Sequence, residues 1–109
     1  MIHETISKIE ARLAQSSVKG ESKAELVQLL GTLKAEVAEL SKTHTEAAQS
    51  IAEFTQVSTH EAMRDERNPA LLEHSLGGLS ASVAGFEKSH PRLVDIVNRI
   101  CTTLSNLGI

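Results

Sequence analysis

The chain has 109 residues, of which 40% are hydrophobic and 23% are charged, a composition typical of one globular domain rather than a disordered segment. Only 2% of the residues are aromatic, so Leu, Ile, Val and Ala supply the apolar area, as in many helix bundles. The formal net charge is −3. Nucleic acid is therefore not an expected partner, because phosphate backbones are bound by clustered Lys and Arg.

No apolar run approaches the roughly 20 residues that span a bilayer, and no basic segment followed by an apolar one marks a signal peptide at the start. Cys101 is the single cysteine and cannot form a disulfide within the chain, which agrees with a reducing compartment. We expect a cytoplasmic protein that does not contact membranes.

Apolar residues recur at steps of three and four along the chain, the spacing of one helix face. The pattern predicts four helices, over residues 2–16, 22–64, 69–88 and 91–107. A heptad seam of alternating steps runs through the second of these from Leu26 to Phe54, as in coiled coils. Asn68-Pro69 supplies a favourable N-cap and first-turn residue for the third.

Pro91 separates the third and fourth predicted helices, because proline lacks an N–H group and clashes with the preceding turn. Phe86, His90 and Leu93 nevertheless keep the heptad spacing across it. We expect the two helices to be roughly collinear with a kink at the proline. The alternative is that the fourth helix folds back on the third.

The apolar seam positions of the second helix match those of the third and fourth when the segments pair antiparallel. In such a pairing, each step forward along one segment is a step back along the other, so apolar residues of the two segments meet at the same level. With a turn near residue 67, Leu40 faces Leu93 and Ile51 faces Val83. The predicted fold is all-α and a single domain: an antiparallel heptad-patterned helical hairpin with a three-helix bundle at one end. That bundle comprises residues 2–13, 26–37 and 97–107, and a two-helix arm extends beyond it.

The arm leaves much of its seam open, which favours a coiled-coil-like homo-oligomer, with a dimer preferred. Small residues on the two arm helices form the candidate interface, because glycine inside a helix is costly unless another helix approaches it closely. These residues are Ala48, Ala52, Thr55, Gly77, Ala81, Ala84 and Gly85. The alternative is that Gly77-Gly78 breaks the third helix within a compact monomer.

His44 and His90 fall in the same predicted seam layer and form a candidate polar layer. A polar residue in such a seam commonly fixes helix register, so a structural pair is the favoured interpretation. A metal bridge or a pH switch is the alternative.

Other chemistry-bearing residues form no recognisable site. His60-Glu61 begins like a zinc-protease helix, but Arg64 occupies the position of the second ligand. Cys101 is interpreted as a small buried apolar group, and no nucleophile has a recognisable base beside it. We therefore expect neither a metal nor another cofactor, and no enzymatic activity.

The segment from Phe86 to Leu93, together with Leu104, Leu107, Gly108 and Ile109, resembles the C-terminal signature of the bacterial domain-of-unknown-function family 4404. The resemblance covers the last quarter of the chain, while residues 41–70 match no known pattern. It implies a bacterial, cytoplasmic, helical protein and supplies no activity. We expect an oligomeric protein-interaction or scaffold module with an unknown protein partner. The alternative is a small-ligand or metal binder that uses His44 and His90.

Overall fold

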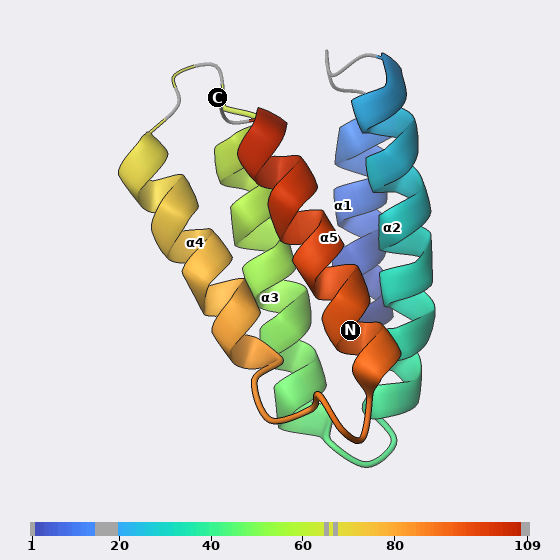
Figure 1. Ribbon diagram of the computed structural model, residues 1–109. Helices are drawn as coiled ribbons and strands as arrows, with labels where there is room; N and C mark the ends of the chain where they lie inside the picture. The colour runs from blue at the N-terminus through green and yellow to red at the C-terminus, as the bar shows by residue number, and fades with distance from the viewer. Residues whose placement is uncertain (1, 15–19, 65, 67, 108–109) are drawn as a thin grey trace.

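The computed structural model describes residues 2–14, 20–64, 66 and 68–107, which form five α-helices and no strand (Figure 1). The helices are α1 (Ile2–Ala14), α2 (Gly20–Leu40), α3 (Thr45–Ala62), α4 (Pro69–Ser82) and α5 (Pro91–Leu107). Consecutive helices run antiparallel. The predicted all-α class is confirmed. Among the described residues, no helix combines the length and the apolar character that crossing a bilayer requires.

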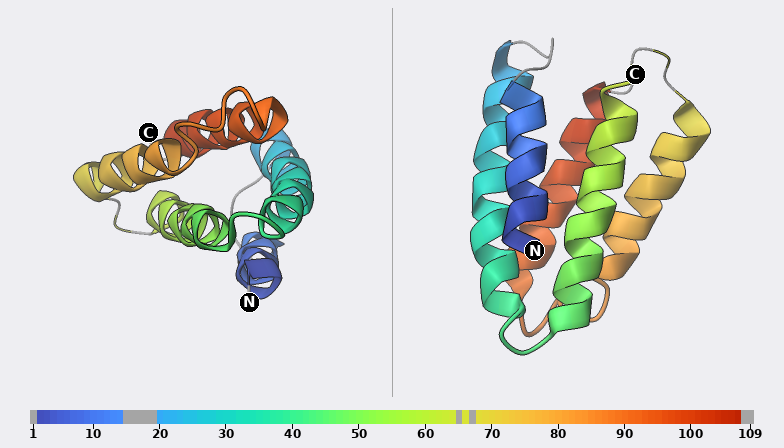
Figure 2. Two further views of the ribbon diagram at one scale, coloured as in Figure 1. Left: turned by 90° about the horizontal axis from the view of Figure 1, so that it is seen from below. Right: turned by 180° about the vertical axis from the view of Figure 1, so that it is seen from behind.

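α3 is the central helix of the bundle, because it packs against each of the other four. Viewed along the bundle, it lies between α4 on one side and α1 and α2 on the other (Figure 2). α2 packs against α5, and α1 packs on α2 and α3 without contacting α4 or α5. The longest dimension of the bundle is 37 Å, too short for a helix of 43 residues, which would be about 65 Å long.

The prediction of one helix over residues 22–64 is wrong, because the chain reverses at residues 41–44 between α2 and α3. Hydroxyl groups in this segment bind backbone carbonyls: Ser41 Oγ donates to Ala38 O at 2.7 Å, and Thr45 Oγ1 donates to Ser41 O at 3.0 Å. Such bonds offer the backbone an alternative to the helical ladder. His44 has φ −134° and ψ 67° and is the N-cap of α3.

The predicted helix over residues 69–88 also ends early, at Ser82. Gly85 has φ +97°, in the left-handed region that favours glycine, and its N–H donates to Glu87 Oε2 at 2.8 Å. Pro91 is the first residue of α5, where its fixed φ suits a helix start. The expected collinear pair is therefore wrong: α5 runs back antiparallel to α4 and packs against it.

These two reversals remove the predicted two-helix arm, since α3 and α4 lie alongside α2 and α5 (Figure 1). The predicted three-helix end is also wrong, because α1 contacts α2 and α3 rather than α5. Glu10 Oε1 lies 2.7 Å from Lys34 Nζ and connects α1 to α2. Because the chain reverses at residues 41–44, α3 runs back along the bundle and forms the second helix against which α1 packs.

The seam positions nevertheless form the core. The buried apolar side chains make one cluster to which all five helices contribute. Fully buried seam residues, with at most 1% of their surface exposed, are Leu26, Leu30, Leu33, Val37, Leu40, Leu93, Val97, Ile100 and Leu104. The predicted start of α4 is confirmed, because Asn68 Oδ1 accepts a hydrogen bond from Leu71 N at 3.2 Å.

Ser58 on α3 is fully buried, and its Oγ has no hydrogen-bond partner. A buried hydroxyl without a partner costs about 1–3 kcal/mol, and alanine has the higher helix propensity. We expect Ser58→Ala to raise the free energy of unfolding by about 1 kcal/mol, measured by urea denaturation.

Ser75→Ala on α4 is the matched control, because Ser75 is also buried but its Oγ donates to Leu71 O at 2.7 Å. Its removal should leave stability unchanged or lower it. An equal gain from both variants would show that helix propensity alone explains the effect.

Candidate functional site

The predicted interface residues separate into a buried set and an exposed set. Ala48, Ala52 and Thr55 on α3 are buried inside the bundle. The predicted interface is therefore wrong for α3, because the small face of this helix packs against its neighbours in the same chain. The other members of the set remain exposed on α4 and the turn that follows it; they are Gly77, Ala81, Ala84 and Gly85.

Gly77 and Gly78 do not break α4, which continues through both to Ser82. A Cβ atom at Gly78 would overlap the Phe54 ring, whereas one at Gly77 would meet nothing within 4 Å. Gly78 thus permits the close approach of α3 to α4 within one chain. The sequence-based prediction instead places a helix of a second chain there. Gly77 lies on open surface.

His44 and His90 do lie beside each other, with their ring centroids 6.1 Å apart. Phe86 completes a three-ring cluster, with its centroid 5.4 Å from that of His44 and 5.6 Å from that of His90. All three pairs meet edge to face, the favoured geometry for aromatic rings. The cluster joins the α2–α3 reversal to the α4–α5 connection at one end of the bundle.

The pair is not enclosed in a seam between helices, because both residues lie in connections. His44 ends the α2–α3 reversal, and His90 directly precedes α5. His44 is exposed and His90 half-exposed. The Nδ1 atoms lie within hydrogen-bond distance of neighbouring hydroxyls, 2.8 Å from Thr43 Oγ1 and 2.9 Å from Ser89 Oγ. Within the described part of the chain no third His, Cys, Asp or Glu joins them, so a metal ion there would have two protein ligands instead of the four usual for structural zinc.

Cys101 is half-buried, and its Sγ lies 3.9 Å from Leu76 O across the α4–α5 contact. Burial raises the pKa of the Cys101 thiol above its ordinary value. Since the thiolate is the nucleophile, this environment disfavours covalent catalysis by the cysteine.

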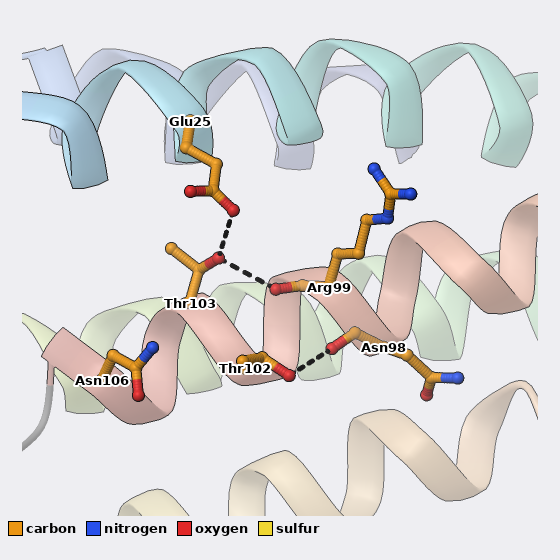
Figure 3. A pocket seen from close by; sticks show the side chains of 6 residues that line it. All are labelled: Glu25, Asn98, Arg99, Thr102, Thr103 and Asn106. Carbon is orange, nitrogen blue, oxygen red and sulfur yellow. Dashed lines mark hydrogen bonds between the residues drawn. The ribbon is translucent and has the colours of Figure 1, made fainter.

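A groove of about 280 Å³ lies along the outer face of α5, beside α2 (Figure 3). Its lining is polar and comprises Glu25, Asn98, Arg99, Thr102, Thr103 and Asn106. Thr103 Oγ1 lies 3.2 Å from Glu25 Oε1 and 2.9 Å from Arg99 O, and its single proton can serve one of them at a time. Arg99 Nε lies 3.2 Å from Asp95 Oδ2. The Arg99 charge is thus paired within the chain, and the Glu25 carboxylate has the Thr103 hydroxyl as its neighbour.

A second groove, of about 200 Å³, separates α1 from α3. Its lining residues are Lys8, Ile9, Arg12, Gln56, Thr59 and His60. Ile9 and Thr59 are buried and form its floor, while the remaining four side chains are exposed around it. This groove does not follow from the predicted helices, because a single helix over residues 22–64 leaves no α3 beside α1. The four-residue spacings of Lys8 with Arg12 and of Gln56 with His60 were the available signal.

The profile of a domain of unknown function, DUF4404, matches residues 26–109. The chain belongs to the DUF4404 family. The match includes residues 41–70, so the middle of the chain is part of DUF4404 rather than a feature of this member. It begins at Leu26 within α2 and continues through α5, whereas α1 precedes the matched range. No curated protein and no solved structure matches the chain.

The Phe86 ring lies edge to face with both histidine rings. Phe86→Leu should change the chemical shifts of the ring protons of His44 and His90, because it removes the ring current between them. It should also destabilise the fold by about 1 kcal/mol, given that an aromatic pair is worth about 0.5–1.5 kcal/mol beyond its buried area.

Phe54→Leu is the control, since Phe54 lies on Gly78 of α4 and has no ring contact with either histidine among the described interactions. Histidine shifts that respond to both variants alike would contradict the cluster.

Proposed function

We propose that this DUF4404 protein is a protein-interaction module that self-associates through the outer face of α4 and the adjoining edge of α3. The observation that carries the proposal is the placement of exposed large hydrophobic side chains. Phe54 and Val57 on α3 and Leu71 on α4 are 39%, 47% and 44% exposed. A fourth, Val27, lies apart from them on α2.

The outer surface of α4 adds to this apolar area. α4 contains a single ionised side chain, that of Glu73, in 14 residues. Gly77 and Ala81 are exposed on it and present little more than backbone and methyl groups. Apolar patches on a protein surface, when they are large, usually mark an interaction site, and these residues on two adjacent helices are the candidates for one here.

A second copy of the chain is the occupant that best fits the charges. A twofold contact places the same patch of each copy against the other, so a charged patch would repel itself. The face of α4 avoids this repulsion because it has so few ionised groups. The exposed glycine also allows two helices to approach closely, as small residues do at helix contacts.

The test compares two substitutions that are chemically identical. Gly77→Glu adds charge to the proposed face, and Gly31→Glu adds it to an exposed site inside α2. A Cβ atom added at either position meets nothing within 4 Å in the chain, and glutamate is the better helix former by up to about 1 kcal/mol. Both variants should therefore fold.

Sedimentation equilibrium at micromolar concentration should show a dimer for the unsubstituted protein and for Gly31→Glu. Gly77→Glu should weaken association at least tenfold, because two buried carboxylates would meet at the twofold axis. A strictly monomeric unsubstituted protein, or equal weakening by both substitutions, would contradict self-association through α4.

A binding role rather than a catalytic one is part of the proposal, and so is a cytoplasmic location. The half-buried Cys101 thiol, with its raised pKa, is a poor nucleophile at neutral pH. The cation of the larger groove, Arg99, is already paired with Asp95, and the single cysteine suits a reducing compartment. Two associated copies would present a doubled surface to further protein partners, which is how a small helical domain can act as a scaffold.

A further inference from the structure

The charged side chains that line the groove between α1 and α3 are all basic. Lys8 and Arg12 project from α1, and Gln56 and His60 from α3. Each of these side chains can donate hydrogen bonds, and no carboxylate lines the groove. This is a concentration of positive charge on a chain whose net charge is −3.

The cations of the groove have no carboxylate partner among the described residues, which is also true of Lys23 and Lys88. Five of the described Lys and Arg side chains lie within 4.0 Å of a carboxylate; they are Lys34, Lys42, Arg64, Arg92 and Arg99. Within the described part of the chain, Lys8 and Arg12 have no such partner. Glu61, next to His60, is held by Arg64 Nη1 at 2.9 Å, and its Oε2 lies 4.0 Å from His60 Nε2.

The ends of the two helices reduce this positive charge without cancelling it. Arg12 and His60 lie in the last turns of α1 and α3, where each helix dipole contributes roughly half a negative charge. Lys8 and Arg12 together carry two positive charges, so the groove retains about one. A concave site with one sign of charge and an apolar floor concentrates ions of the opposite sign.

The size of the groove restricts the ligand. A volume of about 200 Å³ is below the roughly 300–1,000 Å³ of pockets that enclose drug-sized molecules. A phosphate group fits this space and its donors, since it offers several acceptor oxygens to a guanidinium fork, an ammonium group and neutral donors. We propose that the α1–α3 groove binds a small phosphate-bearing anion, with Arg12 and Lys8 as the principal contacts.

The experiment is a titration of the 15N-labelled protein with sodium phosphate at pH 7, with ionic strength held constant by sodium chloride. Backbone amides of residues 8–12 and 56–60 should shift and saturate at millimolar phosphate. Arg12→Gln and Lys8→Gln should each weaken binding at least fivefold. The second variant tests the site without altering the last turn of α1.

Arg99→Gln is the matched control, because it removes the same charge from the other groove, where Arg99 already pairs with Asp95. It should leave phosphate binding unchanged. A parallel titration with glycerol phosphate identifies the source: tighter binding indicates a phosphate monoester, and equal binding indicates free phosphate.

Two results would overturn the proposal. One is the absence of saturable shifts in the groove. The other is equal weakening by the Arg99 and Arg12 variants, which would mean that phosphate responds only to overall charge. A loss of stability in Arg12→Gln without any phosphate binding in the unsubstituted protein would likewise assign Arg12 to the helix end alone.

Discussion

The central position of α3 determines how the other helices are arranged. A helix that packs against four others can be approached closely only if the side chains on its buried face are small, and that face of α3 carries Ala48, Ala52 and Thr55. The hydroxyls of Thr55 and Thr59 donate to carbonyls one turn earlier, at 2.7 and 2.8 Å. Polar residues can therefore be buried there without losing their hydrogen bonds.

This arrangement also connects the core to the two surfaces proposed as binding sites. One side of α3 holds α4 through the contact of Phe54 with Gly78 and leaves the outer face of α4 uncovered. The other side holds α1, which lies before the region matched by the family. The basic groove depends on that additional helix, whereas the apolar face lies entirely within the DUF4404 region.

Much of the core could be predicted from sequence, because burial follows helical periodicity regardless of where the chain reverses. The N-cap of α4 at Asn68 and the start of α5 at Pro91 could also be predicted from the sequence, since each depends on local backbone chemistry. The reversal at residues 41–44 was not. It contains no glycine or proline, and Leu40, His44 and Ala47 keep the heptad spacing through it, so only a cluster of hydroxyl residues indicated a break. The small residues of α3 were then assigned to a second chain because the helices that pack on them were misplaced.

The most direct test of the account is the distance between α1 and α3. Spin labels at Lys8→Cys and Gln56→Cys in a Cys101→Ser background, diluted with unlabelled protein to exclude contacts between copies, would measure it by double electron–electron resonance. Both positions line one groove, so we expect a distance of about 10–20 Å, one interhelix spacing of about 8–10 Å plus the label linkers. The heptad spacing of the sequence pairs Ile9 with Leu30 and so places Lys8 level with Gly31. If α2 and α3 formed one continuous helix, Gln56 would therefore lie about 38 Å further along at 1.5 Å per residue. A distance near that value would contradict the central position of α3.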